Sequence, residues 1–590
     1  MFLRATRRVK DGKQHRYWSI VENQRTQNGK VVQRHVLYLG EINDSQKEAW
    51  CRTIEVFEEG SPQPRQIALF PQDRPRPASG HEVVQVQLDR LELHHPRQWG
   101  ACWLACQLWE ELKLDEFWAE RLPPSREGTR WLEVLKTLVS YQLLDPGSEW
   151  RLHREWYRNS AMGDLLGEGP GLVEDDKLYR CLDRLLRHKE AMFSHLRQRW
   201  QDLFSAGFEV LLYDLTSTYF ECDPPRRGKR KYGYSRDRRS DCVQVVIALI
   251  VTPQGLPLAF EVMDGNTSEK TTLPAFLKKI EQQYGKAQRI WVMDRGIPTE
   301  DTLEQMRQGE SPISYLVGTP RGHLTRLEKD FLARPWGKVR EQVEVKLLQR
   351  DQEVYVLARS VARTAKERGI RRHRLKQLWK RLKELQQQKL ERDQLLLKLG
   401  AAKTQAGKAY QLVEIRLPGK HEPVTAETFT FRLNKQKLRL ARRREGRYLL
   451  RCFQCGEDPA RLWEYYVQLT EIEQVFRELK GDLAVRPIFH QKDSRIESHI
   501  FVAFLAYCLQ VTLKQKARRL ASGLTARSIL EKFRTVQMVD VHLPTTDGRK
   551  LILPRYTQPD KDLQLLLHQL KLKLPAQPPP KILDQETRTG

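Results

Sequence analysis

The sequence predicts an α/β fold built on a sheet of mixed strand directions. Three apolar runs between Phe208 and Val262, and a fourth at Arg289–Asp294, are typical of strands, and the stretch Leu273–Tyr284 has helical spacing. The turn Pro253–Gly255 is short enough to make the second and third strands antiparallel. We therefore expect one mixed sheet with helices packed against it.

A β-hairpin is predicted near the start of the chain. The strand-like runs Tyr17–Glu22 and Val31–Leu39 lie on either side of Asn28-Gly29, a dipeptide that favours tight hairpin turns. We assign residues 1–60 to this N-terminal segment. Residues 61–80 are rich in proline and poor in periodic apolar residues, which is typical of a linker.

A helical domain is predicted between the linker and the sheet. Apolar residues recur at helical spacing from about Pro96 to Phe204, and Pro123-Pro124 and Pro146-Gly147 separate the helices. We assign residues 81–205 to this domain and residues 206–311 to the first part of the sheet.

The sheet is predicted to be interrupted. Between residues 312 and 457, strand-like pieces surround a long charged helix at Thr364–Leu399, and we interpret this range as a β-rich insertion. A helix at Trp463–Lys480 then opens the second part of the sheet domain, residues 458–545. Residues 546–590 form a C-terminal tail, and we expect its Pro-rich end to be disordered.

The charge balance indicates a polyanionic partner. In 590 residues, Lys and Arg outnumber Asp and Glu by 102 to 75, a formal net charge of +27. Nucleic acid is the simplest such partner, and a merely basic protein is the alternative. The longest apolar run, Ile500–Leu509, is shorter than the roughly 20 residues that span a bilayer, so we expect no membrane partner.

The chain is expected to be cytoplasmic. Its first residues lack the apolar segment of a signal peptide, and its nine scattered cysteines do not suggest a disulfide framework. No Gly-x4-Gly-Lys-Ser/Thr loop is present, so we expect no nucleotide cofactor.

Two carboxylates end apolar runs in the predicted sheet. Asp214 and Asp294 each follow such a run directly, so in an open sheet they can lie side by side. Paired carboxylates repel one another unless a cation lies between them, and oxygen donors on a rigid sheet suit Mg²⁺. A pair of this kind with a third carboxylate can hold two ions on a phosphodiester. Strand-end aspartates are also commonly solvated caps.

A third carboxylate lies on a predicted helix. Tyr466, Glu473 and Lys480 are seven residues apart, about two helical turns each, so they share one face, and Arg477 flanks it. A carboxylate among cations suits a site that binds both metal and phosphate. The alternative is an ordinary solvated face with Glu–Arg and Glu–Lys pairs.

The helix carries the residues of a family resemblance. Tyr466-x2-Leu469-x3-Glu473-x6-Lys480 resembles the Tyr-x2-Arg-x3-Glu-x6-Lys signature of one large branch of bacterial insertion-sequence transposases of the DDE class. Other segments resemble that branch too: Tyr213–Glu221, Tyr232–Ser240, Gly265–Glu269, Val292–Gly296, Arg486–His490 and Arg495–His499. The likeness covers roughly residues 208–510, with a less specific match in the N-terminal hairpin.

The resemblance implies an RNase H-like core with a β-strand insertion domain. It also implies that Asp214, Asp294 and Glu473 are the catalytic, metal-binding triad, holding two Mg²⁺ or Mn²⁺ ions. The signature's Arg position is Leu469 here, which leaves the triad intact and puts in doubt only the phosphate contacts at the helix.

A basic run follows the first Asp motif and is our main candidate for DNA contact. Its cations are interleaved with Tyr232 and Tyr234, which can stack on bases. A solvated surface loop is the alternative. The predicted DNA-binding residues are Tyr466, Arg477, Lys480, Arg226, Arg227, Lys229, Arg230, Lys231 and Arg295.

The function implied is that of a DNA transposase. It would act as an endonuclease at the ends of an insertion sequence and transfer the freed 3′-hydroxyls to target DNA. We expect double-stranded DNA as partner, a homodimer that holds two ends, a DNA-binding role for the helical domain, and association with the nucleoid when bound. The alternatives are a repair or recombination nuclease with the same metal core, a catalytically inactive DNA-binding relative, and an unrelated basic scaffold for RNA.

His490 and His499 remain open at this stage. Either can be a ligand or a phosphate contact, but a lone histidine is more often a hydrogen-bonded structural residue. Asp237 and Asp241 are rival carboxylates that we interpret as turn residues or local ion-pair partners.

Overall fold

The structure is a computed structural model. It describes residues 1–10, 13–25, 31–47, 49–51, 85–235, 237, 239–267, 289–294, 298–309, 312–319, 327, 330–331, 334–340, 343–388, 390–420, 422–456, 458–486 and 488–583. The predicted linker at 61–80, the Asn28-Gly29 turn, the helix predicted at Leu273–Tyr284 and Arg295 lie outside these residues.

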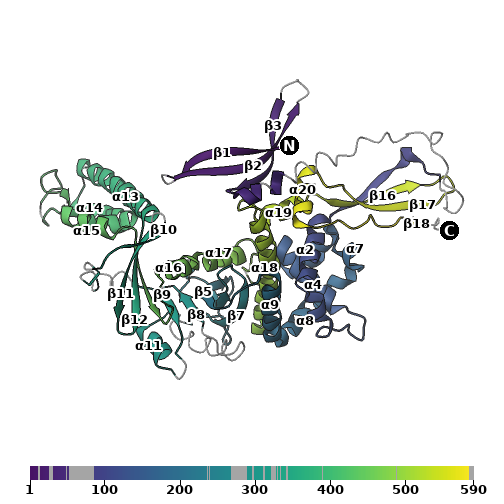
Figure 1. Ribbon diagram of the computed structural model, residues 1–590, viewed down its shortest axis with the longest axis horizontal. Helices are drawn as coiled ribbons and strands as arrows, with labels where there is room; N and C mark the ends of the chain where they lie inside the picture. Colours follow the sequence, from purple (N-terminus) through teal and green to yellow (C-terminus); the bar gives the residue numbers. More distant parts are fainter. Residues whose placement is uncertain are drawn as a thin grey trace.

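The largest sheet is a nine-stranded mixed sheet, which lies to the left of α18 in Figure 1. Strand β5 pairs in parallel with β8, and β8 with β9, while all other neighbours pair antiparallel. The mixed α/β fold class is therefore as predicted. In spatial order the strands are β10 (Gly337–Arg340), β11 (Val343–Arg350), β12 (Glu353–Ser360), β15 (Arg447–Phe453), β9 (Tyr315–Gly318), β8 (Ile290–Met293), β5 (Val210–Phe220), β6 (Val243–Val251) and β7 (Pro257–Asp264).

Strands expected in a separate insertion extend this sheet. The sequence assigns residues 312–457 to the insertion, yet β9 lies directly beside β8, and β15, β12, β11 and β10 continue from it. The exposed edge of a short sheet offers unpaired backbone groups, and adding strands there satisfies them. What projects from the sheet is mainly helical.

The projecting part is a helical hairpin with its own small core. The helix predicted at Thr364–Leu399 is two helices, α13 (Val361–Gln387) and α14 (Arg392–Ala406). Its leucine stripe contributes Leu378 and Leu382, which pack against α14. Further short elements complete this part: η6 (Gly407–Leu412), β13 (Val413–Arg416), β14 (Thr430–Leu433) and α15 (Lys435–Arg444).

One long helix, α18 (Asp493–Leu520), connects the sheet to the helical region. It is long and apolar enough to cross a membrane by length and composition, but 94% of its most apolar window is buried inside the protein, as in a soluble core helix. Helices α2 (Gly100–Glu111), α4 (Trp131–Leu144) and α8 (Asp175–Leu185) pack on it, and one hydrophobic core joins them to the sheet.

The helical region has the predicted character. Its α-helices are α2 (Gly100–Glu111), α3 (Leu114–Ala119), α4 (Trp131–Leu144), α5 (Glu149–Arg151), α6 (Tyr157–Asn159), α7 (Met162–Leu166), α8 (Asp175–Leu185) and α9 (Lys189–Phe204), with short 3₁₀ and π segments η2 (Leu88–Arg90), η3 (Leu152–Trp156), η4 (Pro170–Val173) and η5 (Leu186–His188). Helix α11 (Glu300–Gln308) lies between β8 and β9 in the chain.

The N-terminal segment is a three-stranded antiparallel sheet. The two predicted strands pair as β2 (Lys13–Arg25) and β3 (Val31–Gly40), and β1 (Phe2–Lys10) adds a third strand that we did not predict. The backbone N–H of Gly523 donates to the Leu39 carbonyl, so this sheet rests on the segment after α18.

The C-terminal tail is ordered farther than predicted. Strand β17 (Lys550–Tyr556) pairs with β16 (Gln537–Pro544) and β18 (Lys581–Leu583), and β16 pairs with β4 (Glu92–Gln98). The Pro-rich stretch is held because the Tyr556 side chain and backbone bind it at Pro575 and Gln577. In the chain, α19 (Ala526–Phe533) precedes β16, and α20 (Lys561–Leu570) lies between β17 and β18.

Candidate active site

Asp214 and Asp294 follow neighbouring residues of two parallel strands. The β5–β8 pairing ends with Tyr213 opposite Met293, so the next residue on each strand is an aspartate. Adjacent strands are about 4.8 Å apart, which brings the two carboxylates side by side on one face. Asp214 is half-buried and its Oδ1 accepts a hydrogen bond from the Leu215 backbone N–H at 2.7 Å, whereas Asp294 is exposed.

Helix α17 (Leu469–Lys480) covers the face that carries Asp214. Side chains two residues apart on a strand share a face, so Asp214 and Thr216 point the same way. Thr216 lines a small apolar cavity with Leu479 and Lys480, the last residues of α17. The structure therefore sets the helix predicted to carry the third carboxylate against the strand that carries the first.

Glu473 lies on the exposed side of α17. Its neighbours Ile472, Val475 and Phe476 are buried, whereas Glu473 and Arg477 are exposed one turn apart. Among the described residues, the groups of three ligating side chains with all ligand atoms within 4.8 Å lie elsewhere in the molecule. The three predicted acids thus come from adjoining elements, but their oxygens are not gathered around one point.

Two ion pairs fix α17 to the core helix α18. Glu478 Oε1 lies 2.9 Å from Lys514 Nζ with both side chains buried, and Glu471 lies 3.0 Å from Arg518. A buried carboxylate without its partner is strongly unfavourable, so the Glu478–Lys514 pair holds the position of the helix.

Lys480 is held by the basic loop after β5. Its Nζ lies 3.1 Å from Oδ1 of Asp237, and Arg486 Nη1 lies 2.5 Å from Oδ2 of the same aspartate. The sequence suggested a local role for Asp237, but its partners are more than 240 residues away in the chain. Arg486 was not among the predicted site residues, and its signal was its place in the segment Arg486–His490 that follows α17.

Tyr466 lies on a different helix from Glu473. The predicted helix is divided at Gln468 into α16 (Pro459–Val467) and α17. At this point the Thr470 hydroxyl donates a hydrogen bond to the Val467 carbonyl at 2.9 Å, and side-chain bonds of this kind compete with the bonds of a helix. Tyr466 packs against Tyr448 of β15 and against Trp463, with ring centroids 6.1 and 6.5 Å away. Tyr466 and Glu473 therefore lie on two consecutive helices rather than on one.

The middle of the basic run is bound to protein. Lys229 pairs with Glu497 of α18 at 2.5 Å, and Lys231 pairs with Asp264 of β7 at 2.5 Å. Arg230 is buried, and its guanidinium donates to the Gln491 carbonyl at 2.9 Å. These contacts position the loop, and a role of the three cations in DNA contact stays a prediction.

The ends of the run are exposed. Arg226 and Arg227 are open to solvent, and Tyr232 and Tyr234 expose 52% and 84% of their surface. The backbone between the tyrosines packs tightly against Gly265. A Cβ at Gly233 would lie only 2.0 Å from the Gly265 carbonyl oxygen, so only glycine fits there. The loop thus displays two cations and two aromatic rings from a fixed backbone.

Two family models match the chain. The model described as "Transposase DDE domain" matches residues 209–509, which is 301 of the 590 residues. The model described as "IS1634 family transposase, N-terminal domain" matches residues 3–56.

Comparison with individual proteins gives a further likeness. No curated protein matches the chain. Among solved structures, the cryo-EM structure of a piggyBac transposase synaptic complex with hairpin DNA is similar, with 10% sequence identity, a TM-score of 0.34, and coverage of 73% of this chain and 79% of that chain.

Proposed function

Since the chain belongs to the DDE transposase family and is a DNA transposase of the insertion-sequence type, we propose that it cleaves the two ends of its own element and joins the freed 3′-hydroxyls to target DNA, using Asp214, Asp294 and Glu473. The observation that carries the assignment of residues is the β5–β8 register, which makes Asp214 and Asp294 neighbours. The position of Glu473 on the helix packed over β5 supports it as the third acid.

We assign the central sheet to an RNase H-like core. The order β7-β6-β5-β8-β9, with β6 antiparallel to both of its neighbours and β8 and β9 parallel to β5, supports this assignment. Strands β15, β12, β11 and β10, with the helical hairpin α13–α14, are then the insertion between the second Asp and the Glu.

The DDE domain implies dependence on a divalent metal. Three carboxylates offer hard oxygen donors, which fit Mg²⁺ or Mn²⁺, and we propose two such ions. When bound, the ions would neutralise charge on the attacking and leaving oxygens of the phosphodiester. The chain's own contribution is to hold Asp214 and Asp294 on rigid strands, while Glu473 completes the donor set from α17.

The carboxylates must draw together for this chemistry. Because the described oxygens are not gathered within 4.8 Å, we propose that DNA and metal binding closes the site. The phosphodiester attracts cations and so brings the exposed Arg477 and the loop cations Arg226 and Arg227 to the same region. Lys480 would join them by leaving Asp237 for a phosphate.

The partner we propose is double-stranded DNA, both as element ends and as target. The net charge of +27 supports a phosphate-dominated contact, and two ends require two active sites, hence a homodimer on DNA. The helical region is our candidate for additional DNA contact, and we expect the protein in the bacterial cytoplasm, on the nucleoid when bound.

The test is a joining assay. Purified protein is incubated with Mg²⁺, a labelled duplex that carries the element's terminal sequence, and a supercoiled target plasmid. A transposase yields plasmid with the labelled 3′ end covalently attached. Cleavage of the duplex with no joining, when a precleaved end with a free 3′-hydroxyl is supplied, would identify a nuclease and overturn the proposal.

A further inference from the structure

A carboxylate and two histidines meet in the interior, outside the proposed active site. Glu149 begins the short helix α5 in the helical region, His490 lies in the segment between α17 and α18, and His499 lies on α18. All three are at least nine-tenths buried. Their nitrogen and oxygen ligand atoms lie within 4.8 Å of one another, close enough to surround one ion. The oxygens of Asp214, Asp294 and Glu473 are farther apart than this.

The distances resemble those of ligands around one tetrahedral ion. His490 Nε2 lies 2.9 Å and His499 Nδ1 lies 3.6 Å from the same oxygen of Glu149. Ligand atoms bound to Zn²⁺ at about 2.0–2.1 Å are about 3.3 Å from one another, which falls between these values. Small side-chain movements would therefore complete the geometry.

The orientation of the two rings agrees with the same geometry. Their centroids are 5.2 Å apart and their planes are inclined by 58°. Two imidazoles bound through nitrogen to one tetrahedral ion have centroids about 5 Å apart, because each centroid is about 3.2 Å from the metal. Inclined rings can both direct a nitrogen lone pair at one point, which parallel stacked rings cannot.

The group also has an unsatisfied polar atom. His499 Nε2 is buried and has no hydrogen-bond partner among the described residues. Such atoms are rare in native interiors. The nitrogen of His499 that lies near Glu149 is the other one, Nδ1, so an ion held with Glu149 would bind through Nδ1. Burial raises the pKa of Glu149, but the hydrogen bonds and charges of His490 and His499 together outweigh it and lower the pKa.

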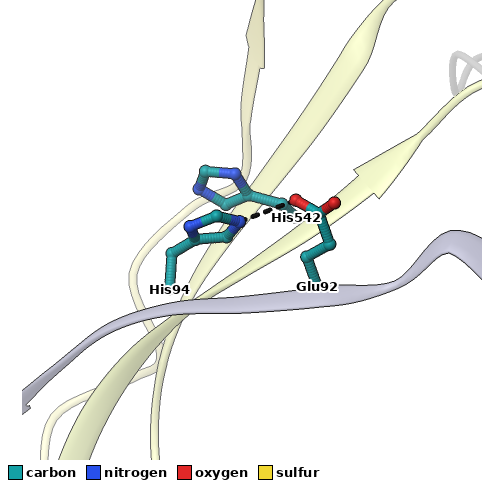
Figure 2. A group of neighbouring side chains, drawn as sticks. All are labelled: Glu92, His94 and His542. Atoms are coloured by element: carbon teal, nitrogen blue, oxygen red, sulfur yellow. Dashed lines mark hydrogen bonds and ion pairs between the residues drawn. The ribbon is translucent and has the colours of Figure 1, made fainter.

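A second Glu–His–His group provides a contrast (Figure 2). Glu92, His94 and His542 lie on the paired strands β4 and β16, and Glu92 and His94 are largely exposed. The His94 and His542 rings stack with centroids 4.2 Å apart and planes inclined by only 27°. Stacked rings do not direct their nitrogens at one ion. The closeness of this surface group is therefore accounted for by the ring stack and by the Glu92–His94 hydrogen bond of 2.7 Å.

We propose that Glu149, His490 and His499 bind one divalent transition-metal ion of the zinc class, with three protein ligands and a fourth position left for water. Two imidazole nitrogens and one carboxylate oxygen suit Zn²⁺ and disfavour Mg²⁺, which prefers oxygen donors. The site is therefore chemically distinct from the all-carboxylate active site. It joins the helical region, the segment after α17 and α18, and it anchors the loop that follows Glu473 and contains Arg486.

The experiment measures metal content and coordination in the full-length protein. The chain is purified without chelator, dialysed against trace zinc and assayed by inductively coupled plasma mass spectrometry, and Co²⁺ is then exchanged into the site. We expect about one zinc per chain, and intense visible absorption from Co²⁺ in a tetrahedral nitrogen and oxygen environment. Glu149→Gln and His499→Asn should each weaken zinc binding by at least about 10–100-fold.

Matched variants separate this site from the others. The double variant His94→Asn/His542→Asn removes the surface pair and should keep the ion, as should Asp214→Asn/Asp294→Asn, which removes active-site donors. A wild-type chain that takes up no zinc and shows no Co²⁺ absorption would overturn the proposal, even if the interior variants fail to fold. So would zinc that survives Glu149→Gln, which would leave the three residues as a hydrogen-bonded cluster. Neither result bears on strand joining.

Discussion

Lys480 Nζ lies 3.1 Å from Asp237 Oδ1, so the last residue of α17 is bound to the loop that follows β5. The pair links the helix of Glu473 to the strand of Asp214, and both side chains are nearly buried. A lysine in such a pair does not bind phosphate until it leaves its carboxylate. We therefore expect Lys480 to pair with Asp237 in the free protein and with a phosphate when DNA is bound.

The Lys480–Asp237 pair gives the first prediction. Lys480→Ala should weaken binding to element ends and lower the slope of log affinity against log salt by about 1, since one phosphate contact is lost. Asp237→Asn should strengthen binding, because it removes a negative charge that competes with phosphate for Lys480 and Arg486. Both are measured by fluorescence anisotropy over a salt series. Equal slopes for wild type and Lys480→Ala would make Lys480 a purely structural residue.

The proposed triad gives the second prediction. Asp214→Asn, Asp294→Asn and Glu473→Gln should each lower the cleavage rate by more than about 100-fold, because each removes a direct metal ligand. Affinity for DNA measured without metal should change little. Asp241→Asn is the matched control, since Asp241 is an exposed carboxylate near the site that pairs with Arg239. Full cleavage by any triad variant removes that residue from the site.

The basic run gives the third prediction, because its cations divide into two sets. Arg226→Ala/Arg227→Ala removes exposed charges and should lower the salt slope by about 2 with an unchanged melting temperature. Lys229→Ala and Arg230→Ala break contacts to α18 and its preceding segment and should lower the melting temperature. Calorimetry and anisotropy on the same samples test this division, and a melting temperature that falls only in the first variant contradicts it.

The buried pair between α17 and α18 gives the fourth prediction. Lys514→Met leaves Glu478 buried without its cation and should cost about 3–5 kcal/mol of unfolding free energy. The double variant Glu478→Leu/Lys514→Met removes both charges and should recover most of that loss. Urea denaturation of the two variants provides the measurement. A double variant as unstable as the single one would show that the pair contributes through packing rather than charge.

The sequence was informative where the signal is local. Hydrophobic runs predicted β5, β6, β7 and β8, and the carboxylates at the ends of two of them were visible without any structure. It was weaker where one segment is decided by another. The sequence assigns β9 to the insertion, and only its pairing with β8 shows that it belongs to the central sheet. The sequence did not predict β1 because its arginines interrupt the apolar pattern of a strand.

Exposure was the part of the candidate site that the sequence could not give. Arg227 and Arg230 are the same residue type in the same basic run, yet one is solvent-exposed and the other is buried over Phe220. The sequence also did not indicate the helix break at Gln468, because the apolar spacing continues through it. The break is marked by a hydrogen bond from the Thr470 hydroxyl to the Val467 carbonyl.

The sequence by itself determined the fold class, the excess of positive charge and the motifs that carry the family resemblance. Net charge follows from composition, and periodicity and motifs can be read from short stretches of the chain. Only the tertiary structure decided which cations are already neutralised, that the inserted strands extend the central sheet, and that Glu149 meets His490 and His499. Ion pairs and ligand sets form between segments hundreds of residues apart. Their partners are fixed by packing of the whole core and not by any local pattern.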